Sequence, residues 1–131
     1  MLRHIFAVLT GFAVWTVLWL AANATLQAAM PEAFREDGAM DETGLLVLSL
    51  FLSVVFSLLA GFTTASMSAR NEMKPVVVLA VIQVLIGIVV EIGYWSAIPV
   101  WYHITFILFL APAIIAGGKL AVGRKMRSSL A

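Results

Sequence analysis

The stretch from residue 76 to residue 98 reads VVVLAVIQVLIGIVVEIGYWSAI and contains a single charged side chain, Glu91. A helix that crosses a bilayer needs roughly 20 mostly apolar residues, so this stretch is long enough to cross one. It lacks the strict alternation of a membrane β-strand and is about twice as long as one. Since every backbone polar group must be hydrogen-bonded within hydrocarbon, we predict that the stretch is a transmembrane helix.

Three further stretches of the same kind cover about residues 5–28, 45–67 and 101–122. The composition agrees, because 63% of the 131 residues are hydrophobic and 11% are charged, against about 25% charged in an average soluble domain. A soluble domain of this size could not bury so much apolar surface. We therefore predict an all-α integral membrane protein, an up-down bundle of four transmembrane helices. It forms one membrane domain over residues 1–131, with the lipid bilayer as a partner.

Proline and capping residues separate the four stretches. Pro31 closes the first, because proline lacks an amide donor and restricts the residue before it. Asp41 and Thr43 are candidate caps of the second, and Pro75 stands in the first turn of the third. Pro99 leaves so short a connection that the third and fourth helices must be antiparallel neighbours.

Basic residues gather on one side of the predicted bundle. With four spans, seven Lys and Arg residues fall on the side of both termini, and Arg35 alone falls on the other. Cytoplasmic loops are enriched in Lys and Arg, so both termini are predicted to be cytoplasmic (N-in/C-in), with the loops at 30–43 and 98–101 outside. Three of the seven are Arg3, Arg70 and Lys74. The other four lie in a basic tail over residues 119–131 and are expected to contact anionic lipid headgroups: Lys119, Arg124, Lys125 and Arg127.

The two loops on the outer side carry further signals. The loop at 30–43 is acidic, with Glu32, Glu36, Asp37, Asp41 and Glu42. It is typical of a solvated acidic face, although it could hold a hard cation or dock on a basic partner, and its spacing matches no calcium loop. Trp95, Trp101 and Tyr102 surround the turn at 98–101, as interfacial aromatic residues do.

The first stretch allows a second interpretation. Arg3, an apolar run and Ala22-Asn23-Ala24 resemble a secretory signal with a small-residue cleavage site. The apolar run is longer than a usual signal core, which favours a retained helix.

Glu91 is the most informative polar residue. At about 1.5 Å per residue it lies roughly 12 Å inside the outer boundary of the third helix. Ionisable residues inside a membrane are costly, so Glu91 is either a proton or cation site or a neutral carboxyl that hydrogen-bonds a neighbouring helix. Asn23, His103 and Gln83 are its candidate partners. A cluster of Asn23, Glu91 and His103 in the outer half of the bundle follows, and a structural polar network is the simpler interpretation.

The second helix carries a stripe of small and hydroxyl residues. Such residues let membrane helices approach closely and hydrogen-bond across the contact, while a water-lined path is the alternative. The stripe contains Ser49, Ser53, Ser57, Gly61 and Thr64, and Gly117 extends the small-residue spacing to the fourth helix. Pro112 is expected to bend that helix, and Gly117-Gly118 is expected to loosen or end it.

Enzymatic and cofactor functions find little support. No phosphate loop, nucleophile–base pair or metal-ligand spacing is present, and the chain has no cysteine. His4 and His103 fall at opposite membrane surfaces, so they cannot share one haem. The net charge of +1 is not the basic excess of a nucleic-acid-binding protein. We expect no catalytic residue, no metal, no cofactor and no nucleic-acid partner.

Short motifs in the second to fourth helices resemble those of small bacterial four-span membrane proteins of uncharacterised function. They are Gly61-Phe-Thr-Thr-Ala65, Ile98-Pro-Val-Trp-Tyr-His103, Ala111-Pro112 and Gly117-Gly118-Lys-Leu120. The resemblance implies a multi-pass protein of a bacterial inner (cytoplasmic) membrane. It implies no activity and no catalytic residues.

The function predicted from these observations is that of an interaction protein. A bundle this small has little mass for a substrate pathway of its own. It is predicted to be a non-enzymatic accessory, assembly or stabilising subunit of a larger membrane complex, or a homo-oligomer. The alternative is a small oligomeric proton- or cation-coupled transporter or channel that uses Glu91.

Overall fold

The computed structural model describes residues 1–36, 39–40, 42–69 and 73–130. It contains four long helices, α1 (Leu2–Ala29), α2 (Thr43–Met67), α3 (Lys74–Gly93) and α4 (Val100–Leu130), with a short 3-10 helix, η1 (Pro31–Ala33), after α1. Each long helix is apolar and long enough to cross a membrane. The chain is therefore an all-α, multi-pass membrane protein. Three residues named from the sequence, Asp37, Asp41 and Arg70, lie outside the described residues.

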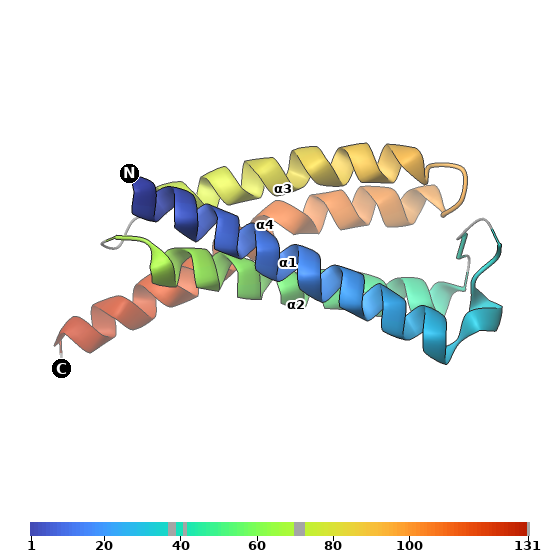
Figure 1. Cartoon of the computed structure of the whole chain (residues 1–131), viewed down its shortest axis with the longest axis horizontal. Helices are drawn as coiled ribbons and strands as arrows, with labels where there is room; N and C mark the ends of the chain where they lie inside the picture. Colours follow the sequence, from blue (N-terminus) through green and yellow to red (C-terminus); the bar gives the residue numbers. More distant parts are fainter. Residues whose placement is uncertain (37–38, 41, 70–72, 131) are drawn as a thin grey trace.

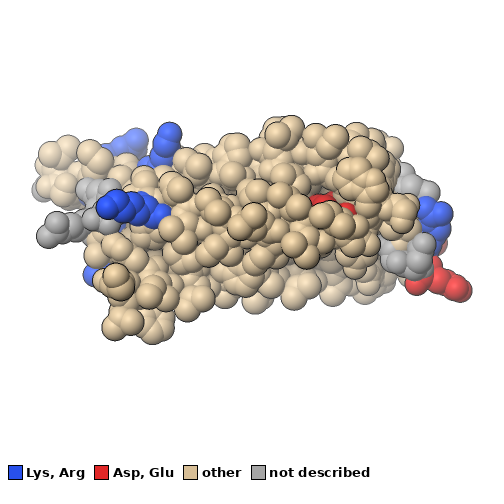
Figure 2. Space-filling model, turned by 90° about the horizontal axis from the view of Figure 1, so that it is seen from above, with Lys and Arg blue, Asp and Glu red and all other residues tan. Residues whose placement is uncertain are grey.

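The bundle has two chemically different ends (Figure 1). Both chain termini lie at one end, called here the terminal end, where α2 stops and α3 starts. The opposite loop end holds the connection from α1 to α2 and the turn between α3 and α4. Figure 2 shows Lys and Arg side chains gathered at the terminal end, whereas acidic and basic side chains lie together at the loop end.

Helices that are neighbours in space are not all neighbours in the chain. α2 makes its most extensive contact with α4, and it also packs against α1, while α3 packs against α4 and α1. The order around the bundle is therefore α1, α2, α4, α3. Because α2 and α4 both run from the loop end to the terminal end, this central contact joins parallel helices (Figure 1). The predicted antiparallel contact between the third and fourth helices is present as well.

Glycines allow α2 and α4 to touch through their backbones. A Cβ atom on Gly61 would lie 1.9 Å from the carbonyl oxygen of Ile114, and one on Gly117 would lie 2.0 Å from that of Leu58. Any larger residue would push the helices apart, since the obstructing atoms are backbone atoms. The small-residue spacing is thus used within the chain.

Two helix limits differ from the prediction. α3 ends at Gly93 and not near 98, because the chain needs a turn through residues 94–98 to reverse before α4. α4 continues past residue 122 to Leu130, so the predicted basic tail is helical and Gly117-Gly118 does not end the helix. The glycine pair is buried against α2 and α3, and these contacts hold the helix together there.

Candidate functional site

The last turn of α3 and the first turn of α4 bring Glu91 and His103 together near the loop end. Both side chains are buried, with 7% of Glu91 and 2% of His103 exposed. The His103 Nδ1 atom is hydrogen-bonded to the Glu91 Oε2 atom. The structure therefore joins two of the four polar residues that the sequence singled out within the membrane.

The second ring nitrogen of His103 determines where the protons lie. His103 Nε2 is 3.1 Å from the carbonyl oxygen of Ile98. A carbonyl oxygen only accepts, so Nε2 must carry a hydrogen and donate it. One proton is then shared between Nδ1 and Oε2, either as an imidazolium beside a carboxylate or as a neutral imidazole beside a carboxylic acid. In both states the pair has no net charge, which lowers the cost of burying it.

Aromatic rings enclose this pair. The Trp95 ring stacks on the His103 ring with centroids 4.9 Å apart and an angle of 13° between their planes. Tyr102 meets His103 edge-on at 6.3 Å and stacks on Phe106 at 5.9 Å. Tyr102 is buried, so it is not the interfacial residue that the sequence suggested, because the first turn of α4 directs it inward. Trp95 and Trp101 are exposed at the loop end, as predicted.

The other two predicted polar residues lie apart from the pair. The Asn23 Nδ2 atom donates to the Trp19 carbonyl oxygen on its own helix at 2.9 Å, and no described contact links Asn23 to Glu91. Gln83 precedes Glu91 by eight residues on α3, about 12 Å along the axis. Its side chain is 2% exposed, and Oε1 has no hydrogen-bond partner among the described residues. The predicted cluster is therefore reduced to Glu91 and His103.

The hydroxyl stripe of α2 faces the inside of the bundle. All of its predicted members are buried: Ser49, Ser53, Ser57, Gly61 and Thr64. The Ser53 and Ser57 hydroxyls donate to carbonyl oxygens of α2 itself. Ser57 also accepts a hydrogen bond of 3.0 Å from the Trp15 indole, and Thr64 donates to the Ala7 carbonyl oxygen at 3.2 Å. These groups join α1 to α2, and the hydroxyl hydrogens of Ser53, Ser57 and Thr64 are all donated within the bundle.

Basic residues at the terminal end hold the end of α2. Lys125 Nζ donates to the carbonyl oxygens of Ala65 and Ser68, and Arg3 Nε donates to that of Met67 at 2.8 Å. The sequence suggested that Lys125 contacts lipid headgroups, and the structure directs its ammonium to these helix carbonyls. Lys119, Arg124 and Arg127 are exposed. The sequence signal for this arrangement is that α2 has no basic residue in its own last turn, so its terminal carbonyl oxygens are available to basic residues of other helices.

Within the described part of the chain, no group of three His, Cys, Asp or Glu side chains is placed to hold a metal ion. Comparison of the chain with protein-family models, curated proteins and solved structures finds no match. The resemblance to small bacterial four-span proteins therefore stays a prediction. The function has to be inferred from the geometry of the bundle.

Proposed function

We propose that this chain is a non-enzymatic membrane protein that acts as an accessory, assembly or stabilising subunit of a larger complex, or as a homo-oligomer. The observation that supports this proposal is the use of buried polar groups inside the bundle. Glu91 is engaged by His103 and Trp15 by Ser57, and the part-buried Lys125 is engaged by the end of α2. Groups that are satisfied in this way serve helix packing, and they leave few free polar atoms to bind a substrate.

The outer faces of the helices are the surfaces left for a partner. α1 buries only Ala7, Gly11 and Trp15 within the described chain, although it is 28 residues long. Its large exposed apolar side chains, which include Phe6, Val17 and Leu20, are available to lipid or to a helix of another protein. We propose a bacterial inner membrane on the basis of the resemblance to small bacterial four-span proteins, and cytoplasmic termini on the basis of the basic terminal end.

The native mass tests this proposal. The protein is extracted from its own membranes in mild detergent, and the species that migrate with it are identified. We expect reproducible co-migration with larger subunits, or a closed homo-oligomer. A monomer that migrates alone, from membranes with normal expression, would contradict the proposal.

A proton- or cation-coupled transporter is the second candidate, and the Glu91–His103 pair is the observation that favours it. A buried carboxyl beside an imidazole that shares a proton is a chemically suitable relay. Its test is flux into vesicles containing the purified protein under a pH gradient. A flux that the wild type supports and Glu91→Gln abolishes would establish transport. An accessory role should survive Glu91→Gln, because glutamine keeps the shape and a hydrogen bond.

A further inference from the structure

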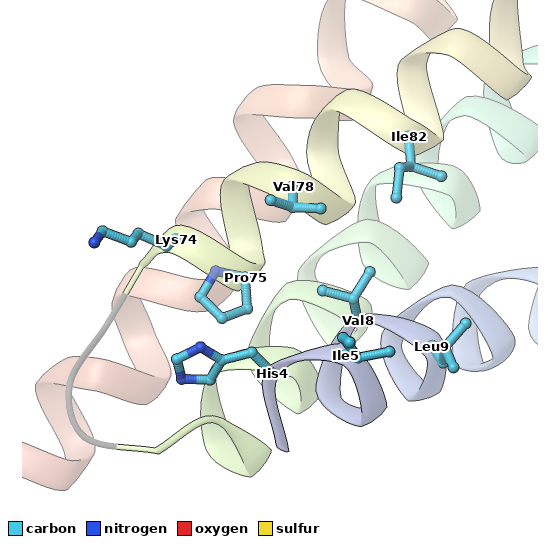
Figure 3. Close-up of a pocket in the computed structure, with 8 residues that line it drawn as sticks. All are labelled: His4, Ile5, Val8, Leu9, Lys74, Pro75, Val78 and Ile82. Atoms are coloured by element: carbon cyan, nitrogen blue, oxygen red, sulfur yellow. The ribbon is translucent and has the colours of Figure 1, made fainter. Parts of the chain in front are cut away.

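A groove opens between α1 and α3 at the terminal end of the bundle. Its volume is about 370 Å³, within the range of roughly 300–1,000 Å³ in which proteins hold small molecules. The walls are His4, Ile5 and Val8 on α1 and Lys74, Val78 and Ile82 on α3. Figure 3 shows Val8 and Ile82 directed into the gap between the helices. It shows Lys74 extending away from the bundle at the groove's end.

The groove is apolar, and both of its walls belong to helices that are apolar and long enough to cross a membrane. From Lys74 to Ile82 the α3 wall rises by about 12 Å, beginning at the end of a membrane-spanning helix. Ile5 and Val78 are exposed at its edges, so the groove is open to the side and not only to water. An occupant that enters from the bilayer is therefore a hydrocarbon chain.

The mouth of the groove carries positive charge. α1 and α3 both begin at the terminal end, so the positive ends of two helix dipoles lie beside the mouth. The Lys74 ammonium adds a full charge at the same place. No Asp or Glu within the described residues lies at this end, and Arg70 and Glu72, which are outside them, have opposite charges. This end of the groove therefore fits an anionic group.

A second, more open hollow meets the groove at Lys74. It is lined by Met73, Lys74, Val77 and Val78, and thus shares Lys74 and Val78 with the groove. Two apolar hollows that meet at one ammonium match a molecule with two hydrocarbon chains joined to one anionic head.

We propose that this site binds an anionic glycerophospholipid. One acyl chain lies between α1 and α3, the other lies over the neighbouring hollow, and the phosphate lies beside Lys74. The bound lipid fills the groove between α1 and α3, two helices that pack against each other less extensively than α1 packs against α2. This site is separate from the Glu91–His103 pair at the loop end, and it does not depend on the function proposed above.

Native mass spectrometry of the full chain in mild detergent tests the site. The protein is titrated with phosphatidylglycerol and with phosphatidylcholine of equal chain length. We expect one phosphatidylglycerol molecule to be retained in preference to phosphatidylcholine. Lys74→Gln should weaken phosphatidylglycerol binding by about fivefold, the effect of one basic residue near a phosphate. Lys119→Gln removes an exposed lysine of α4 that lies outside the groove lining, and it should weaken retention of this lipid less than Lys74→Gln does.

A second pair of variants tests the position of the acyl chain. Val78→Trp fills the groove, and Val89→Trp places the same side chain on a part of α3 where the valine is 70% exposed. Val78→Trp should abolish retention of either lipid, and Val89→Trp should not. Ile5→Trp fills the groove from the α1 side if Val78→Trp fails to fold.

Three results would overturn the proposal. Equal losses in Lys74→Gln and Lys119→Gln would show that the attraction is spread over the whole terminal end. Wild-type lipid retention in both groove-filling variants would show that the chain does not lie there. Loss of a dimer mass in Val78→Trp, with lipid retention unchanged, would identify a second copy of the chain as the occupant.

Discussion

At the scale of single residues, the Glu91–His103 pair explains how a carboxyl group is accommodated inside a membrane bundle. Each polar atom of the imidazole has a partner, because Nδ1 meets Glu91 and Nε2 meets the Ile98 carbonyl oxygen. The pair is neutral as a whole, and the Trp95 ring covers it. The turn between α3 and α4 is therefore closed by one hydrogen-bonded unit.

Substitutions of Glu91 should separate hydrogen bonding from charge. In Glu91→Gln the amide can donate to a neutral His103 Nδ1, so we expect a loss of less than about 1 kcal/mol in unfolding free energy. Glu91→Leu leaves Nδ1 buried without a partner, and we expect a loss of about 1–3 kcal/mol. Unfolding in mixed detergent measures both. Equal and large losses would show instead that the pair must be ionic to hold the turn.

Gln83 is a buried polar group whose oxygen is not used within the described bundle. We expect Gln83→Leu to raise the unfolding free energy by about 1 kcal/mol, because it removes an unsatisfied acceptor and keeps a similar volume. Gln27→Leu, on the exposed part of α1, is the matched control and should change little. Detergent unfolding midpoints compare the two variants. Destabilisation by Gln83→Leu would indicate that the amide oxygen binds an ordered water or another partner.

At the scale of the helices, α2 is the element on which the others assemble. Its face of small and hydroxyl residues packs against α4 through glycine and against α1 through Trp15 and Thr64. At its last turn, Arg3 from α1 and Lys125 from α4 donate to its terminal carbonyl oxygens. The surrounding helices thus satisfy the end of α2, which has no basic residue in its own last turn.

Alanine substitutions of glycine should have opposite effects at packed and open positions. Gly61→Ala and Gly117→Ala place a methyl group about 2 Å from backbone oxygen atoms, and we expect losses of about 1–3 kcal/mol or more. A methyl group at Gly123 would have nothing within 4 Å of it, so Gly123→Ala should gain up to about 1 kcal/mol from helix propensity. Detergent unfolding compares the three variants. Tolerance of alanine at position 61 or 117 would contradict the close contact between α2 and α4.

Lys125 should stabilise α2 from a different helix. Lys125→Met removes a cation from the carbonyl oxygens at the end of α2, and we expect a local loss of about 1 kcal/mol. Hydrogen exchange over residues 64–68 should become faster in this variant. Lys119→Met, which removes an exposed lysine of the same helix, should leave that exchange unchanged. The same protection in both variants would show that the Lys125 contact contributes little.

At the scale of the whole molecule, four alternating spans place both termini at one end, and most of the Lys and Arg residues of the chain lie toward that end (Figures 1 and 2). The acidic connection after α1 lies at the other end. This separation of charge predicts an orientation, with the terminal end in the cytoplasm. The proposed lipid site then faces the cytoplasmic leaflet, where anionic lipids are abundant.

Single cysteines test the orientation directly, because the chain has none of its own. We expect Glu32→Cys to react with a membrane-impermeant maleimide in spheroplasts. Ser129→Cys should react only after the membrane is opened. The reverse pattern would invert the orientation, and labelling of both positions in intact spheroplasts would contradict four spans.

The sequence alone determined that the chain is a membrane protein with four helices, since insertion into hydrocarbon depends on the length and polarity of each segment. It also identified Glu91 and His103 as polar residues near one membrane boundary, because their depth follows from position along a helix. The stripe of glycine and hydroxyl residues on α2 also follows from the sequence, because residues three or four positions apart lie on one face of a helix. These properties are local, so no knowledge of neighbouring helices is needed.

Only the tertiary structure decided which of these residues meet. It paired Glu91 with His103 and left Asn23 on its own helix, although all three lie toward the same end. It extended α4 to Leu130 through packed glycines and directed Lys125 to the end of α2. It also placed α1 beside α3, which creates the groove at Lys74. Each of these depends on how helices distant in sequence are arranged around one another, and the hydropathy of a single helix contains no such information.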